Sequence, residues 1–202
     1  AAKLSRWAAY HAADDALRHK CLRTFGSALE VLRMMTYYSS FDVMEYVDEW
    51  DSHTKEVVKK RLGPFPQNRF FTAKEAQCIT KIAEHLTYDD DKDILAWIVH
   101  HFDGILFSDI GESQRKYGTP RQKDLVRDGL KALDDCAKKA HGKDFMSIGP
   151  KEQGELLGDI QQNKAPGVTR WTKVPQKEFF QKLAEIIISA YYSHPSVWSQ
   201  IG

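Results

Sequence analysis

The sequence predicts an all-α protein, in which a compact multi-helix domain at residues 67–202 follows an N-terminal helical extension at residues 1–66. Apolar residues recur at intervals of three and four nearly everywhere, which is the spacing of one helix face. No segment shows an alternating strand pattern that is better than its helical alternative. The composition, 42% hydrophobic and 28% charged, is that of an ordinary globular protein.

Two helices are expected in the extension. The first, at about residues 5–38, contains no proline and a single glycine, and the second spans about residues 42–62. The stretch "GPFPQN" at 63–68 has two prolines in six residues and marks the boundary with the domain. Further loops are expected at 108–120 and 161–175.

The next helix, at 73–87, has the best-marked start in the chain. Thr72 and Glu75 form the Thr-x-x-Glu arrangement of a capping box, in which each side chain accepts the backbone N–H of the other residue. A helix at 94–107 follows, with Trp97 and His101 on its apolar side.

Three helices complete the predicted domain. The segment 121–140 has one apolar stripe opposite a charged face. Near 147–160, Gly149 is the expected N-cap and Pro150 the first helical residue. The segment 178–192 has only a narrow polar strip, so we expect it to be covered on more than one side.

The charges argue against nucleic-acid binding, and the lengths of the apolar stretches argue against a membrane span. Lys and Arg number 29, Asp and Glu 28, and the charges alternate without forming a basic block, so we expect no nucleic-acid binding. The most basic run, at 55–63, follows a group of acidic residues and is typical of a solvated helix face. No apolar stretch approaches the roughly 20 residues of a bilayer span, so no direct membrane span is expected.

The cysteines give no sign of a metal site. Cys21, Cys78 and Cys136 lie far apart, without a CxxC pair or a zinc-finger spacing. Three buried thiols are the commonest arrangement for such a set. The alternative, one disulfide with one spare thiol, is left open by the sequence.

The acidic run at 87–93 places Asp89, Asp91 and Asp93 at the 1, 3, 5 spacing of a calcium loop. Ile94 and His100 then stand where an EF-hand requires glycine and a bidentate glutamate. The run is better explained by carboxylates that cap the following helix.

The histidines also favour structural roles. His100 and His101 are adjacent, so on a helix they point about 100° apart and cannot readily bind one ion. His101 lies on an apolar stripe, which is typical of a core or interface histidine. His141 precedes Gly142 and is expected to interact with a helix C-terminus.

Sequence motifs for catalysis are missing. There is no GxSxG nucleophile elbow, no GxxxxGK phosphate loop and no GxGxxG dinucleotide fingerprint. We therefore expect no catalytic, cofactor-binding or metal-binding residue and no intrinsic enzymatic activity.

Four passages, taken in order, resemble the gluconate 2-dehydrogenase subunit 3 family. They are "FFTAKEAQCITKIAEHLTYDDD" at 70–91, a "GLxxLD" helix, a "GKxF…PxxQ" passage and a final "FF…YYSxP". The ending is most similar to small subunits that accompany sugar and glucoside 3-dehydrogenases. The sequence departs from the family at Thr87-Tyr88, where Ile-Pro is usual. The matching residues are Gly129, Leu130, Leu133, Asp134, Gly142, Lys143, Phe145, Pro150, Gln153, Phe179, Phe180, Tyr191, Tyr192, Ser193 and Pro195.

The resemblance implies a non-catalytic accessory subunit that stabilises, assembles or helps to export a large flavoprotein of the glucose-methanol-choline type. In such complexes FAD belongs to the large subunit, and haem c is often present in a further cytochrome c subunit. The resemblance also implies that the complex is membrane-associated or periplasmic and that this chain is periplasmic or exported. A free-standing helical scaffold module with a non-redox partner is the alternative, and an independent metal-dependent or hydrolytic enzyme is a third hypothesis.

The chain ends in "EIIISAYYSHPSVWSQIG", which is unusually rich in apolar and aromatic residues. Pro195 is expected to end the helix and to turn the aromatic side chains outward into a docking tail. Aromatic anchors dominate the energetics of most interfaces. The predicted partner interface consists of Tyr191, Tyr192, His194, Trp198 and Ile201.

Overall fold

The computed structural model describes residues 41–108, 111–112 and 117–201. Over these ranges the protein is all-α, as predicted, and contains no strand. None of the helices described there is long and apolar enough to cross a bilayer. The expected helix at 5–38 and Cys21 lie outside the described residues. The α-helices are α4 (Ser52–Lys59), α5 (Ala73–Thr87), α6 (Lys92–Phe107), α7 (Gln122–His141), α8 (Pro150–Gln161), α9 (Gln176–Ser193) and α10 (Pro195–Ile201). The short 3-10 helices are η1 (Val43–Glu49), η3 (Phe145–Ser147) and η4 (Thr169–Thr172).

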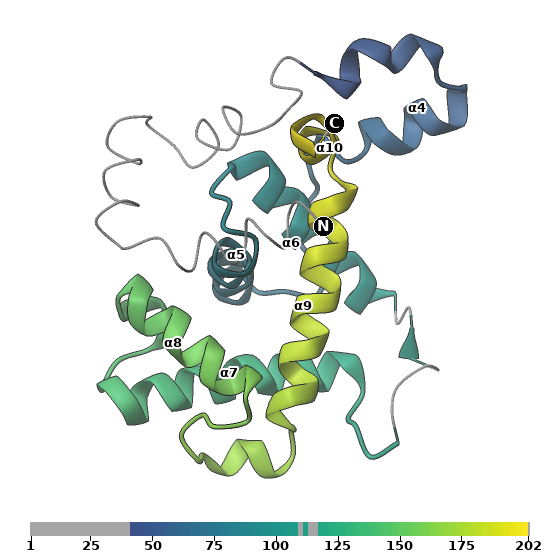
Figure 1. The fold of residues 1–202 in the computed structure, drawn as a ribbon. Helices are drawn as coiled ribbons and strands as arrows, with labels where there is room; N and C mark the ends of the chain where they lie inside the picture. The colour runs from purple at the N-terminus through teal and green to yellow at the C-terminus, as the bar shows by residue number, and fades with distance from the viewer. Residues whose placement is uncertain (1–40, 109–110, 113–116, 202) are drawn as a thin grey trace, which may run out of the picture.

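Helix α9 forms the centre of the fold. It packs against α5, α6, α7, α8 and α10, and it runs through the molecule from η4 at one end to α10 at the other (Figure 1). Leu183, Ile187 and Ala190 on this helix are completely buried. Only a narrow strip that includes Glu185 and Ser189 is exposed, which confirms that the helix is covered on more than one side.

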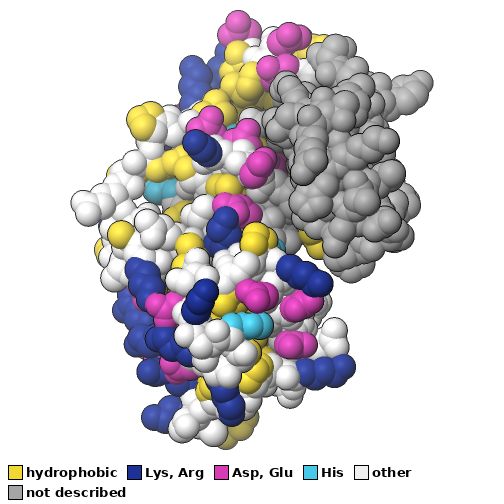
Figure 2. Space-filling view, turned by 90° about the vertical axis from the view of Figure 1, so that its left-hand side faces the viewer, with side chains coloured by type: hydrophobic (Ala, Val, Ile, Leu, Met, Phe, Trp, Pro, Cys, Tyr) yellow, Lys and Arg dark blue, Asp and Glu magenta, His cyan; other side chains and the backbone are white. Residues whose placement is uncertain are grey.

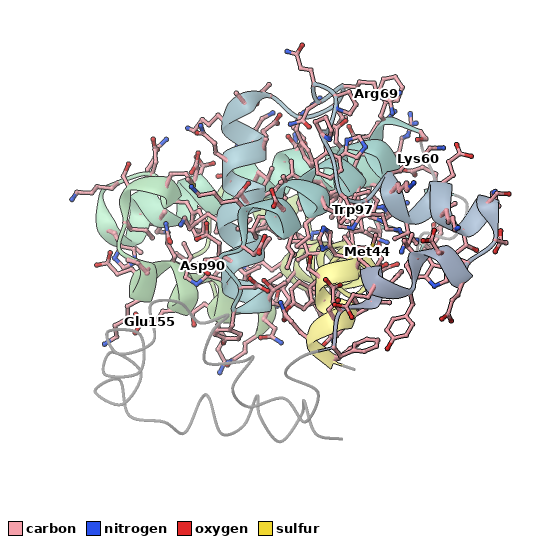
Figure 3. The ribbon with its side chains drawn as sticks, turned by 90° about the horizontal axis from the view of Figure 1, so that it is seen from above. Met44, Lys60, Arg69, Asp90, Trp97 and Glu155 are labelled. Carbon is pink, nitrogen blue, oxygen red and sulfur yellow. The ribbon has the colours of Figure 1, made fainter. Side chains whose placement is uncertain are left out.

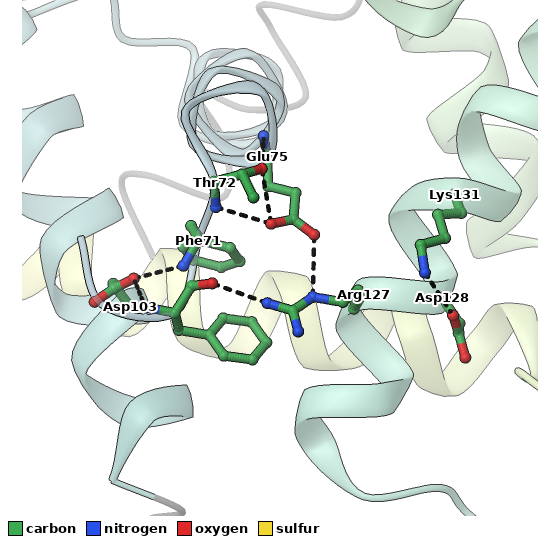
Figure 4. A network of polar contacts seen from close by, with 8 residues as sticks. Phe71, Thr72, Glu75, Asp103, Arg127, Asp128 and Lys131 are labelled. Atoms are coloured by element: carbon green, nitrogen blue, oxygen red, sulfur yellow. Dashed lines mark hydrogen bonds and ion pairs between the residues drawn. The ribbon is translucent and has the colours of Figure 1, made fainter.

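The start of α5 is fixed to two neighbouring helices (Figure 4). Thr72 and Glu75 form the predicted capping box. Glu75 also accepts a hydrogen bond from Nε of Arg127 on α7 at 3.2 Å, and Arg127 donates a second one to the carbonyl of Phe70 at 2.8 Å. This network joins α5 to α7 through one guanidinium group.

Asp103 of α6 holds the segment that leads into α5. Its buried carboxylate accepts the backbone N–H groups of Arg69, Phe70 and Phe71 at 2.8 to 2.9 Å. A buried carboxylate is stable only when it is well hydrogen-bonded, and here three donors supply that requirement.

The contact between α7 and α9 depends on a glycine. A Cβ atom at Gly129 would lie 2.2 Å from Cδ2 of Phe179, so the phenyl ring packs directly against the α7 backbone. Phe179 is completely buried and also contacts the ring of Trp171, with centroids 5.9 Å apart. Any larger residue at this position would force the two helices apart.

The connection between α7 and α8 is tied by two polar side chains. The N–H of Phe145 donates to Oδ1 of Asp134 at 3.2 Å, and the amide of Gln153 donates to the Phe145 carbonyl at 2.9 Å. As predicted, Pro150 is the first residue of α8 and Gly149 its N-cap, with the Gly149 N–H bonded to Glu152 at 2.7 Å. The left-handed Gly142, φ 71°, ends α7.

Two predictions about helix boundaries were wrong. The single helix expected at 42–62 is divided into η1 and α4, because Trp50 is extended (ψ 150°) and Asp51 begins a new helix. Its carboxylate accepts the N–H groups of His53 and Thr54 at 2.9 and 3.0 Å. The loop expected at 161–175 contains the short helix η4.

Candidate partner interface

The joint between α9 and α10 is built around His194. Helix α9 ends just before it, as predicted, but Pro195 starts a second helix instead of an outward tail. The His194 carbonyl accepts the N–H groups of Val197 and Trp198 at 3.0 and 3.2 Å. Its Nδ1 accepts the N–H of Ser196 at 3.3 Å. His194 thus caps α10, and the aromatic residues expected on a tail are held on a helix.

The five residues predicted to form the interface are divided by this geometry. Tyr191 and His194 are 4% and 1% exposed, so they lie inside the chain. Tyr192 is 42% and Ile201 45% exposed. Trp198 is half-buried, and its indole N–H donates to the Tyr192 carbonyl at 2.6 Å. Only Tyr192, Trp198 and Ile201 therefore have surface that a partner can reach directly.

Tyr191 has an internal partner of its own. Its hydroxyl donates to Oδ2 of Asp89, which is 3% exposed, at 3.0 Å. Burial raises the pKa of Tyr191, and the adjacent Asp89 carboxylate raises it further. Burial likewise raises the pKa of Asp89 above its ordinary value. The pair joins α9 to the loop before α6.

Trp97 and Arg61 also hold the joint, and neither was predicted to lie there. The indole N–H of Trp97 donates to the Ala190 carbonyl and to the Ser193 hydroxyl, both at 3.0 Å. Arg61 donates to the Ser193 carbonyl at 2.7 Å, and its guanidinium lies 5.4 Å from the ring centre of Trp198. Trp97 could be predicted only as an apolar residue of α6, and no local pattern indicates the role of Arg61.

The described part of the extension covers α10. The Ser199 hydroxyl donates to Asp42 at 3.1 Å and accepts the Val43 N–H at 3.0 Å. Tyr46 on η1 is 45% exposed, and its ring stacks on Phe41 with centroids 5.7 Å apart. Figure 3 looks onto this end of the molecule and shows η1 and α4 on one side of it. Helix η1 therefore adds exposed aromatic area beside α10.

The acidic run before α6 has a structural use. Asp91 accepts the N–H groups of Asp93 and Ile94 at 2.9 and 3.1 Å, which confirms that it caps the helix. Within the described ranges, no group of three or more His, Cys, Asp and Glu side chains could hold a metal ion. Cys78 and Cys136 are buried free thiols, and burial raises the pKa of Cys78 to about 12.

His100 faces the loop at the other end of the extension, whereas His101 contacts the ring of Trp97, with centroids 5.2 Å apart. The ring of His100 stacks on Phe65 with centroids 4.9 Å apart, in a shallow pocket of about 450 Å³ that is also lined by α4. Glu56 in the pocket wall is paired with Lys60 at 2.7 Å. Partial burial lowers the pKa of both histidines. Glu56 is the one carboxylate among the described residues that line this pocket, and because it is already paired with Lys60 we assign no ligand to the pocket.

The residues that carry the family resemblance are mostly structural. Gly129 and Phe179 set the distance between α7 and α9, and Asp134 and Gln153 fix the connection to α8. Tyr191 bonds to Asp89 within the fold. These motif residues therefore specify a helical scaffold, whereas Tyr192, which also belongs to the motif, is exposed.

The described residues form an all-α domain assembled on one long central helix. Comparison with protein families then gives a specific answer, because the model of gluconate 2-dehydrogenase subunit 3 matches residues 65–202. The match covers more than half of the chain, and the chain belongs to that family, named for a subunit of a dehydrogenase. Comparisons with curated proteins and with solved structures gave no match.

Proposed function

We propose that this chain is the small accessory subunit of an FAD-dependent sugar or glucoside dehydrogenase complex. The observation that carries the proposal is the family match over residues 65–202. The partner is a large flavoprotein of the glucose-methanol-choline type, which binds FAD and supplies the catalytic residues. A cytochrome c subunit with haem c is a further partner. The complex is membrane-associated or periplasmic, and this chain is periplasmic or exported.

The α9–α10 end is the surface that we assign to the flavoprotein. Tyr192, Ile201 and Tyr46 are each more than 40% exposed there. Large aromatic side chains on a rigid frame lose little conformational entropy on binding, and they are enriched among the residues that dominate interface energies. Permanent subunit interfaces bury more than about 2,000 Å², so the contact would extend from α10 onto η1.

The role of the chain in this proposal is to stabilise and assemble its partner. Several residues that match the family form contacts within the fold, such as the hydrogen bond from the Tyr191 hydroxyl to Asp89 at 3.0 Å. Binding to the folded flavoprotein and not to its unfolded form would stabilise that subunit by mass action.

Affinity capture from the native source tests the proposal. The full chain should capture a flavoprotein that is identified by its FAD absorbance and by mass spectrometry. Tyr192→Ala should weaken capture by about tenfold, because it removes an exposed aromatic anchor. Trp198→Ala should weaken it also, since Trp198 holds the Tyr192 carbonyl. Tyr117→Ala is the matched control, because Tyr117 is fully exposed in the segment before α7.

Two results would contradict the proposal. If the wild-type chain is recovered alone, it is not a stable subunit of such a complex. If it captures a protein without flavin, the scaffold alternative is correct. If Tyr192→Ala and Trp198→Ala capture the flavoprotein as well as the wild type does, the interface lies on another surface.

A further inference from the structure

The two ends of α9 differ sharply in charge, although the net charge of the whole chain is only +1. Residues 42–51, which include η1 beside α10, contain five carboxylates and no Lys or Arg. At the other end, the chain between Asp159 and Glu178 contains four cations and no carboxylate. Helix α9 has 18 residues, so the two segments lie about 27 Å apart along it.

The cations of the second segment are all at the surface. They are Lys164, Arg170, Lys173 and Lys177, and we call the surface that they form the basic end. Arg170 is paired with Asp135 at 2.7 Å, and Lys164 donates to Gln162 at 2.8 Å. Lys173 and Lys177 form no ion pair or side-chain hydrogen bond with any described residue. Figure 2 shows Lys and Arg side chains gathered over the lower part of the molecule, where α7, α8 and η4 lie.

The basic end is held in a fixed shape. Gln176, which is 9% exposed, accepts the Ala165 N–H at 3.1 Å, and so closes the loop on itself. Trp171 donates to the Cys136 thiol at 3.0 Å, and the thiol donates to the Pro166 carbonyl at 3.2 Å. A long irregular connection in a compact domain is commonly functional. Here its backbone is pinned to α7, so its lysines extend from a preformed frame and lose less entropy when a partner binds.

We infer that the basic end is a second docking surface, which binds an acidic protein surface on the large subunit of the complex. The inference rests on the proposed function and adds the chemistry and position of a second contact. An acidic patch opposite the unpaired lysines would accelerate association and fix the orientation of the two subunits.

Other anionic partners fit less well. A polyanion such as nucleic acid is attracted by a broad basic face, but the rest of this chain, with 25 Lys and Arg against 28 Asp and Glu, has a net charge of −3. Trp171 is half-buried and its N–H is occupied by Cys136, so no exposed aromatic ring is available for base stacking or membrane insertion. A second copy could present its own acidic residues 42–51, and such a head-to-tail contact would join many copies into a ring or an open filament. Lys55 pairs with Asp48 and thereby offsets part of the negative charge of residues 42–51.

Charge reversal in the full chain tests the inference. The variant Lys164→Glu, Lys173→Glu, Lys177→Glu alters only exposed side chains outside the core. The matched control is Lys59→Glu, Lys92→Glu, Lys151→Glu, which makes the same change of net charge at exposed positions elsewhere. Both variants should unfold at nearly the wild-type temperature, and both are used to capture the flavoprotein from the native source.

The expected result has two parts. At about 50 mM NaCl the first variant should capture the flavoprotein about tenfold less efficiently than the wild type, whereas the control should not differ. Raising NaCl to about 300 mM should narrow the gap, because exposed charges are then largely screened.

Equal capture by both variants at low salt would overturn the inference and leave the proposed function intact. A wild-type chain that captures no flavoprotein at all would overturn both. The inference would also be wrong if the first variant loses binding only to single-stranded DNA or to phosphatidylserine vesicles. A concentration-dependent mass of the wild-type chain that the first variant abolishes would instead assign the surface to a second copy.

Discussion

The two ends of α9 are stabilised in different ways. At its start, Phe179 packs directly on the backbone of Gly129 and is completely buried. At its end, the joint with α10 depends on polar contacts from distant segments, such as the hydrogen bond from Arg61 to the Ser193 carbonyl at 2.7 Å. Both ends include residues that carry the family resemblance, Phe179 at the first and Tyr191 at the second, but the second is completed by the extension. The difference indicates that the family residues build the scaffold at both ends, while the extension completes the surface beside α10.

Gly129→Ala should have the largest effect on stability. Because the new Cβ would lie 2.2 Å from the Phe179 ring, α7 and α9 must separate or the ring must leave its site. We expect a loss of about 3 kcal/mol in the free energy of unfolding, measured by chemical denaturation. Gly158→Ala in α8 is the control, since nothing lies within 4 Å of its new Cβ, and it should be neutral or slightly stabilising. Equal effects would show that the close packing is not specific.

Asp103→Ala should follow, with a loss of about 2 to 3 kcal/mol. The substitution leaves the N–H groups of Arg69, Phe70 and Phe71 without their shared acceptor in a largely buried site. Asp93→Ala on the same helix removes an exposed carboxylate and should cost less than about 1 kcal/mol. Chemical denaturation measures both losses. A small loss of stability in Asp103→Ala would show that water can accept these N–H groups in place of the carboxylate.

Arg61→Ala tests the other end of α9. We expect a loss of about 1 to 2 kcal/mol, together with faster hydrogen exchange in α10, because the Ser193 carbonyl loses a charged donor and Trp198 loses its cationic neighbour. Lys60→Ala removes only an exposed pair with Glu56 and should change stability by less than about 0.5 kcal/mol. If α10 exchanges no faster in Arg61→Ala, the extension does not hold it.

The smallest effect is expected from the titration of His194. Burial lowers its pKa, while the nearby carboxylates of Asp91 and Asp93 oppose this shift. The unfolded chain therefore binds more protons than the folded one below about pH 6.5, and the stability from neutral His194 is lost as the pH falls. The charged ring also could not accept the Ser196 N–H.

The variant His194→Asn isolates this contribution, because asparagine can still cap α10 but does not titrate. Its free energy of unfolding should fall less than that of the wild type between about pH 7.5 and about pH 5.5. Some dependence should persist, since burial also lowers the pKa of His100 and His101. Identical pH profiles would show that His194 is neutral or charged to the same extent in both states.

The sequence predicted what is local and missed what is distant. The capping box at Thr72 and the glycine that ends α7 were predicted because their signals lie within a few residues. The break at Asp51 was missed, although an acidic residue before Ser52 is a typical N-cap. The contact between Gly129 and Phe179 joins positions 50 residues apart, and no local pattern shows which side chain needs the space.

The predicted interface shows the same limit. Tyr191 and Tyr192 are adjacent, so on a helix they point in different directions, and only the packing of α9 decides which of them is buried. The position of Arg61 depends on how the extension folds back over the joint. The chemistry of this end was thus predictable as aromatic and apolar, but the accessible residues were not.

The most direct test of the account is the native mass of the untagged chain in extract from its source. The account predicts that the chain elutes with a flavoprotein, in a complex much heavier than its own 23.2 kDa, with FAD absorbance in the same fractions. Elution of all the chain as a stable 23.2 kDa monomer, without flavin, would contradict it.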